Sequence, residues 1–232
     1  MREAPMKTFR GEESSRGGRP RGFDRDQALD VAMRLFWRHG YEGVSIGDLT
    51  ARLGIAAPSL YAAFGSKAEL YRAALERYEE ISDFLDVDGM AEAPTLELAV
   101  RKVLEAGVRA VTSGDRERGC MISDGLVSCG EAHQELAADL ARRRRKLRAA
   151  FARALGQWVD KAAAQSLARY VSALLQGLSI QARDGAAAAE LRTIVDVACA
   201  GLGASPRPRI GARSPRPTVK SAWRETRRER ER

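Results

Sequence analysis

The stretch 45–67, SIGDLTARLGIAAPSLYAAFGSK, constrains the fold more than any other part of this sequence. Ser45 followed by Asp48 is typical of a helix N-cap with an acidic residue three positions later. Apolar residues then recur at helical spacing until Gly54, which can end a helix with a positive φ. Pro58 is tolerated in the first turn of a second short helix. The pattern predicts two short helices joined by a tight turn, as in helix-turn-helix units and also in ordinary helical hairpins.

Helical signals continue on both sides of this stretch. Asp24, with Gln27 three residues later, predicts a helix that runs to about Arg38. Ser66, with Glu69 three residues later, predicts a capping box for a helix that continues to about Phe84. A small core is expected to hold these helices together, made of Phe36, Leu49, Leu60 and Phe64.

The string Gly-Ile-Ala-Ala-Pro-Ser-Leu-Tyr-Ala-Ala-Phe-Gly-Ser-Lys resembles the recognition-helix signature of the TetR family of bacterial repressors. Upstream residues of the same family pattern are Ala28-Leu29 through Leu35-Phe36, Gly40-Tyr41, Val44-Ser45-Ile46 and Leu49. The resemblance covers about Phe23 to Leu75. It implies a helix-turn-helix domain, a dimer and a double-stranded DNA operator as partner.

The resemblance also implies individual DNA contacts. Tyr61 and Lys67 correspond to phosphate contacts at the two ends of the recognition helix, and Ser45 can add a further phosphate contact. The positions that face base edges are Ala57, Pro58, Ser59 and Ala62. These side chains can contact thymine methyls or hydrogen-bond through the serine, but none can make a bidentate contact to guanine. We therefore expect weak base readout, supplemented by DNA shape and by an arginine arm that includes Arg21.

The net charge of +8 lies in the chain ends. Residues 1–23 hold six basic and three acidic residues, and residues 204–232 hold ten and three. The segment between them is nearly neutral, so basic composition alone does not identify a DNA-binding domain. We expect a disordered basic arm at 1–22 and a disordered Arg/Pro-rich tail at 204–232, either solvated or attracted to phosphate.

The rest of the chain predicts an all-α protein of about nine helices. A helix-turn-helix domain at 23–66 is followed by a regulatory and dimerisation domain at 67–203, in which the first helix is the connector. An acidic loop is expected at 86–94. Further helices are expected at 95–112, after Gly119-Cys120, and at 131–158, 164–182 and 187–202. The five consecutive cations at 142–146 are interpreted as solvated or snorkelling side chains.

The second domain would respond to a small-molecule effector of unknown identity. A cavity is predicted from Phe84, Val108, Met121, Leu126 and Phe151, with plain core as the favoured alternative for each residue. Cys120 could be a thiol sensor near a helix N-terminus or a structural cysteine. The resemblance places a homodimer interface on the last two helices, where the apolar candidates are Leu167, Val171, Leu174, Leu178, Ile194, Ala198 and Leu202.

Several functional classes are disfavoured by the sequence. No apolar run is long enough to span a membrane and no secretory signal is recognisable at the start, so no membrane partner and a cytoplasmic location are expected. The three scattered cysteines and two isolated histidines predict no metal site and no cofactor. An enzyme would need a convergent set of reactive residues, which we do not find.

The sequence thus predicts a dimeric repressor that an effector releases from a pseudo-palindromic operator by shifting the connecting helix. The alternatives are a thiol-sensing repressor acting through Cys120 and an architectural DNA-binding protein. Whether the protein represses or activates depends on operator position, which the sequence does not contain.

Overall fold

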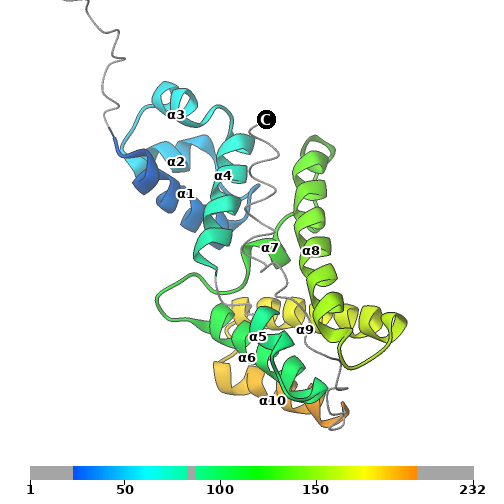
Figure 1. Ribbon diagram of the computed structural model, residues 1–232. Coiled ribbons are helices and arrows are strands. Elements are labelled where there is room, and N and C mark those ends of the chain that lie inside the picture. The colour runs from blue at the N-terminus through cyan, green and yellow to red at the C-terminus, as the bar shows by residue number, and fades with distance from the viewer. Residues whose placement is uncertain (1–22, 83–86, 203–232) are drawn as a thin grey trace, which may run out of the picture.

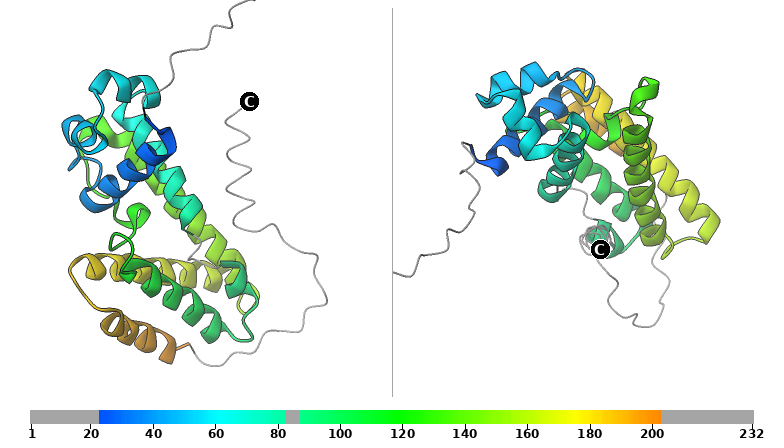
Figure 2. Two further views of the ribbon diagram at one scale, coloured as in Figure 1. Left: turned by 90° about the vertical axis from the view of Figure 1, so that its left-hand side faces the viewer. Right: turned by 90° about the horizontal axis from the view of Figure 1, so that it is seen from above.

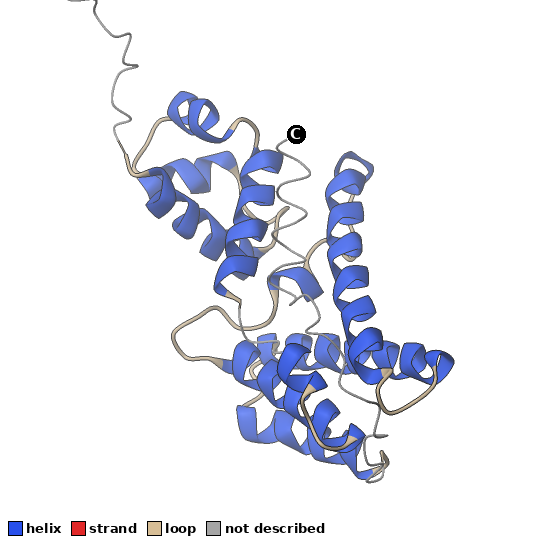
Figure 3. Cartoon of the chain, in the orientation of Figure 1, coloured by secondary structure: helices blue, strands red, loops and turns tan. Residues whose placement is uncertain are grey.

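A computed structural model describes residues 23–82 and 87–202, and every regular element in these two ranges is helical (Figure 3). The described residues form ten α-helices and one short 3₁₀-helix, η1. The all-α class is therefore confirmed, with one more α-helix than the sequence predicts. No helix in the described ranges combines the length and apolar character needed to cross a bilayer.

The first four helices form one group at the top of Figure 1. They are α1 (Arg25–His39), α2 (Ile46–Leu53), α3 (Ala57–Phe64) and α4 (Lys67–Ile81). Their starts follow the sequence signals, because Asp24, Ser45 and Ser66 are N-caps whose side chains accept backbone N–H groups. Gly54 ends α2 in the left-handed conformation, with φ +65°.

One hydrophobic cluster, here called the upper core, holds this group together. The four residues expected in it, Phe36, Leu49, Leu60 and Phe64, are all buried there. Aromatic rings of α1 and α4 meet edge to face, with centroids 5.1 Å apart for Phe36 and Tyr71. The upper core also extends beyond the helix-turn-helix, because Met121, Leu136 and Leu140 belong to it.

The predicted acidic loop at 86–94 is partly wrong. A short helix, α5 (Val87–Ala91), occupies it, and Val87 and Met90 are buried in a hydrophobic cluster formed with later helices. Two apolar residues at i and i+3 make a helical turn that can bury one side, a signal that the intervening Asp and Gly obscure. The preceding helix, expected to reach about Phe84, ends at Ile81 within the described residues.

The remaining helices form a second group. They are α6 (Leu96–Thr112), α7 (Met121–Asp124), η1 (Glu131–His133), α8 (Gln134–Leu155), α9 (Lys161–Arg183) and α10 (Ala188–Ala200). Most of this group lies below the first, while the start of α8 stands beside α4 (Figure 1). Their apolar faces make a second cluster, the lower core, in which Val103, Phe151 and Val171 are fully buried. The left view of Figure 2 shows α6, α9 and α10 packed together away from α1–α3.

Helix α8 reaches both groups. At about 1.5 Å per residue its 22 residues span about 33 Å, and Figure 1 shows it running from the level of α4 down to α9. Leu136 and Leu140 near its start belong to the upper core, whereas Phe151 and Leu155 near its end belong to the lower core. The two groups are therefore joined by α8 as well as by the chain after α4.

The arginine run in α8 corrects the expectation that all five cations are solvated or snorkelling side chains. Arg143 is buried and bonds to Glu79 of α4 and to Asp139 of its own helix. Arg144 donates to the carbonyl oxygens of Ile122 and Gly125, at 2.7 and 3.0 Å. Five consecutive helical residues point all round the axis, so some of these cations must face neighbouring elements.

Candidate nucleic-acid interface

Helix α3 is held on the upper core by one side and exposes the other. Leu60 and Phe64 are buried, one helical turn apart, whereas Pro58, Ser59 and Ala62 are exposed. Ala57 is half-buried, and Tyr61 is 47% exposed. The α3 residues expected to contact DNA therefore lie on the exposed side, except Ala57, which lies at its edge. Their contacts with DNA stay a prediction.

Tyr61 and Lys67 both line a shallow crevice between the start of α2 and the turn from α3 into α4. Its lining residues are Ile46, Leu60, Tyr61, Phe64, Gly65, Ser66, Lys67 and Leu70. The surface of the crevice itself is apolar, so it only places Tyr61 and Lys67 as neighbours near the N-terminus of α4. A hydroxyl and an ammonium group near a helix N-terminus can bind phosphate, and their contact with DNA stays a prediction.

Lys67 is positioned by an aromatic ring. Its Nζ lies 4.3 Å from the centroid of the Tyr41 ring, which is within the range of a cation–π interaction. Partial burial lowers the pKa of Lys67, while the carboxylates of Glu42 and Asp48 act in the opposite direction. The ring restricts the lysine side chain before any DNA is bound, so less rotamer freedom is lost on binding.

Tyr41 is a residue whose role sequence reasoning missed. It packs against Phe36 and Tyr71 of the upper core and also meets the His133 ring edge to face at 4.9 Å. His133 belongs to η1, so the second group of helices touches the aromatic ring that holds Lys67. Gly40-Tyr41 was recognisable in the sequence, but the contact between Tyr41 and the distant His133 was not.

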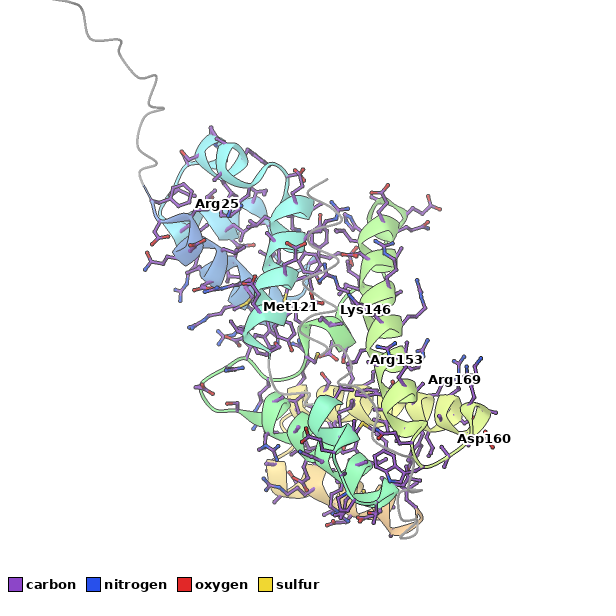
Figure 4. The ribbon with its side chains drawn as sticks, in the orientation of Figure 1. Arg25, Met121, Lys146, Arg153, Asp160 and Arg169 are labelled. Carbon is purple, nitrogen blue, oxygen red and sulfur yellow. The ribbon has the colours of Figure 1, made fainter. Side chains whose placement is uncertain are left out.

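Arg25 is a second residue that the sequence did not single out. Its guanidinium lies 4.8 Å from the Phe64 ring centroid, and its Nε donates to the carbonyl oxygen of Ala63 at 3.4 Å. Figure 4 labels it at the start of α1. Because Ala63 and Phe64 form the end of α3, Arg25 fixes that end against α1 and caps an unpaired carbonyl.

Ser45 is exposed at the start of α2 but is engaged in a full capping box. Its Oγ accepts the Asp48 N–H at 3.0 Å and donates to the Asp48 carboxylate at 2.6 Å. Hydrogen bonds from the Ser45 hydroxyl and N–H lower the pKa of Asp48. A phosphate contact by the Ser45 hydroxyl would have to replace its bond to that carboxylate, and this contact stays a prediction. Arg21 lies outside the described residues.

The five residues of the predicted effector cavity do not share one cluster. Val108 and Phe151 are buried in the lower core, whereas Met121 is buried in the upper core and Leu126 packs against it. Phe84 lies outside the described residues. Figure 4 labels Met121 on α7, between the two groups. An effector that touched all four described residues would have to bind at the junction between the cores, and this site stays a prediction.

Cys120 is the N-cap of α7. It is partly exposed, and its Sγ accepts the N–H of Ser123 at 3.5 Å. Cys120 and Cys129 are free and partly exposed, and Cys199 is free and buried. Within the described residues, no group of three or more His, Cys, Asp or Glu side chains is placed to hold a metal ion.

The predicted dimer residues need a correction. Val171, Leu178 and Ala198 are buried in the lower core of the chain itself, so a second copy cannot touch them. Helical periodicity identifies the stripe facing the chain's own core, and an interface lies on another side. The outward-facing apolar residues of α9 and α10 are Tyr170, Ile180 and Val197. The half-buried Leu167, Leu174, Ile194 and Leu202 stay predictions.

Comparisons with known proteins agree with this architecture. The family model "Bacterial regulatory proteins, tetR family" matches residues 28–74, which span α1 to α4 except for their outer ends. The HTH-type transcriptional repressor ComR of Escherichia coli K12 is 35% identical over 188 residues, covering 76% of this chain and 88% of ComR. The repressor BdcR of the same strain is 32% identical, covering 72% and 83%.

A solved structure extends the likeness to three dimensions. A cysteine mutant of the TetR family regulator CifR, complexed with 26-bp double-stranded operator DNA, matches with a TM-score of 0.73 and 32% identity. The match covers 80% of this chain and all of the CifR chain. Sequence and structure agree over both helical groups, and we conclude that the chain belongs to the TetR family of bacterial regulatory proteins.

Proposed function

We propose that this protein is a sequence-specific transcriptional repressor that binds a pseudo-palindromic operator as a homodimer. The observation that carries the proposal is the exposed side of α3, with Tyr61 and the ring-held Lys67 together at one crevice. The curated names of ComR and BdcR as repressors, and the operator complex of CifR, support it.

Phosphate contacts would supply most of the affinity. Tyr61, Lys67 and Ser45 would bind the backbone, and the Arg21 arm would add contacts beside the site. Pro58, Ser59 and Ala62 would face base edges, where small side chains favour thymine methyl contacts over hydrogen bonds to guanine. DNA shape would then carry part of the specificity.

The dimer would form through the outward sides of α9 and α10. Tyr170, Ile180 and Val197 are exposed apolar side chains on these helices. A side chain at Gly177 or Gly201 would meet nothing within 4 Å in the single chain, so a second helix could approach there closely. Such a dimer would present its two α3 helices to half-sites about 34–36 Å apart.

An effector would weaken DNA binding by favouring a conformation in which the two α3 helices no longer match this spacing. A small molecule at the junction between the cores would act on α4 and α7 together. Modification of Cys120 is the second candidate trigger, because this partly exposed thiol caps α7 at the same junction.

A binding titration with the DNA upstream of the protein's own gene tests the proposal. The full chain is titrated in excess competitor DNA at several salt concentrations. A repressor should form a discrete complex that survives competitor, and a variant lacking 205–232 should keep the same sequence preference. The result for an architectural DNA-binding protein would differ: competitor DNA would abolish the complex, and deletion of 205–232 would remove most of the affinity.

A further inference from the structure

Arg183, the last residue of α9, reaches across to the end of α1. Its Nη2 donates to the carbonyl oxygen of Trp37 at 2.8 Å, and its Nη1 lies 3.5 Å from the carbonyl oxygen of Arg38. Both carbonyls belong to the last turn of α1, where the helix offers no internal partner. A cation at a helix C-terminus is also favoured by the helix dipole.

The guanidinium is held from its other side by Asp124 of α7. One carboxylate oxygen, Oδ2, accepts from Arg183 Nε and from the hydroxyl of Ser179, the latter at 2.8 Å. Ser179 is fully buried on α9, one turn before Arg183. The Arg183 cluster, defined here as Arg183, Asp124, Ser179 and the Trp37 carbonyl, therefore joins α1, α7 and α9.

The connector before α7 reinforces the same junction. The Trp37 indole donates to the carbonyl oxygen of Gly119 at 3.1 Å, and Arg38 pairs with Glu117 at 2.7 Å. Gly119 has φ +81°, and a Cβ there would lie 2.6 Å from Arg183 Nε. Only glycine lets the connector pass so close to the guanidinium in this backbone conformation.

The end of α9 does not depend on Arg183 for its own capping. Arg118 donates to the carbonyl oxygens of Ala182 and Ala186, at 3.0 and 3.2 Å. The hydrogen bonds of the Arg183 guanidinium instead go to α7 and α1. Its role is therefore to fix one helical group against the other.

We propose that Arg183 is a positioning residue for operator binding. It fixes the angle between α1, which carries α2 and α3, and α9, which carries the proposed dimer face, and so sets the separation of the two recognition helices. This inference rests on the proposed function, since it needs a dimer on two half-sites. It adds a direct route from α9 to α1 that does not pass through α4.

The test uses the full chain and the upstream DNA fragment that forms the discrete complex. Its two half-sites are moved apart or together by one and two base pairs, and one isolated half-site serves as a separate probe. The variants are Arg183→Gln, which removes the charged fork, and Arg183→Lys, which keeps the charge but cannot reach both partners in the same way. The matched control is Arg153→Gln, an exposed arginine on α8 that Figure 4 labels.

We expect Arg183→Gln to weaken binding at the preferred spacing by roughly 3- to 30-fold. The spacing profile should flatten, because the two α3 helices are no longer held at one separation. Affinity for the isolated half-site and the dimer dissociation constant should not change. Arg183→Lys should recover part of the loss, and Arg153→Gln should behave like the unaltered protein.

Two results would overturn the inference. The first is an unchanged spacing profile for Arg183→Gln. The second is an equal loss of affinity for the half-site and the full operator, which would indicate general damage to the helix-turn-helix. If the unaltered protein itself shows no preferred spacing, the proposed dimeric function fails and the inference fails with it.

Discussion

Replacing Arg143 with methionine should destabilise the protein strongly, because this side chain neutralises two buried carboxylates. Arg143 Nη1 lies 2.6 Å from Glu79 Oε2, and its Nε lies 3.3 Å from Asp139 Oδ2. The three side chains are 7%, 13% and 6% exposed. Methionine fills a similar volume but leaves Glu79 without its ion-pair partner. Asp139 then keeps Arg142, which is largely exposed and lies 3.1 Å away.

The expected loss is large compared with the stability of a typical domain. Removing one partner of a buried ion pair costs about 3–5 kcal/mol, since the remaining charge stays desolvated. Typical unfolding free energies are about 5–15 kcal/mol. The apolar triple variant Arg143→Met, Glu79→Leu and Asp139→Leu should recover most of the loss, because no uncompensated charge remains.

The loss should also depend on pH. Burial raises the pKa of Glu79 even with Arg143 beside it, and removal of the arginine raises that pKa further. A raised carboxyl pKa in the folded state imposes a penalty at pH values above it, and the penalty disappears as pH falls through it. The destabilisation of Arg143→Met should therefore be greatest near neutral pH and smaller toward about pH 5, near the ordinary glutamate range.

Equilibrium denaturation at several pH values measures these effects. The matched control is Arg145→Met on the exposed side of the same helix, which should change the unfolding free energy by less than about 0.5 kcal/mol. Equal effects of the two single variants would refute the reasoning, as would a loss in Arg143→Met that grows on acidification.

Three further predictions concern the DNA contacts, the dimer and a turn. Lys67→Ala should weaken operator binding and reduce the slope of log affinity against log salt by about 1 per protomer in titrations, whereas Tyr41→Leu should weaken binding and leave that slope unchanged. Ile180→Asp should place a charge in the proposed interface and convert the dimer to monomer in sedimentation velocity runs, with little change in the thermal midpoint of the monomer fold. Gly54→Ala should lower the unfolding free energy by about 1 kcal/mol, because φ is +65° there although the site has open space. Denaturant unfolding measures this loss. An unchanged unfolding free energy would contradict the prediction, because it would mean that the backbone at residue 54 relaxes to accommodate alanine.

Local signals made the first four helices predictable from sequence. Ser45 and Ser66 begin helices with capping boxes that involve residues only three positions away. Gly54 ends α2 through its own backbone freedom. Helical periodicity was enough to predict the small core of α1–α3. These helices are neighbours in the chain, so their apolar faces pack against one another.

The parts that sequence reasoning missed depend on residues distant in the chain. Arg143 looked like one of five solvated cations, and only the position of α4 against α8 buries it. Arg183 gave no sequence signal, since its partner at Trp37 is a backbone carbonyl 146 positions away. Three of the expected dimer residues, Val171, Leu178 and Ala198, lie in the chain's own core for a related reason. Periodicity identifies an apolar face but does not say whether the chain's own core or a second copy covers it.

Under the proposed function, the contacts between the two helical groups would allow DNA binding to be controlled at more than one point. Glu79 links α4 to α8, Arg183 links α1 to α9, and His133 meets the ring that holds Lys67. Each contact has one partner in the group that carries the recognition helix and one in the group that carries the proposed dimer face. A change that separates the groups must break or exchange several of these contacts together, which favours two discrete arrangements over a gradual drift. An effector would then need only to bind one arrangement more tightly, and its differential affinity would set the fraction of protein released from DNA.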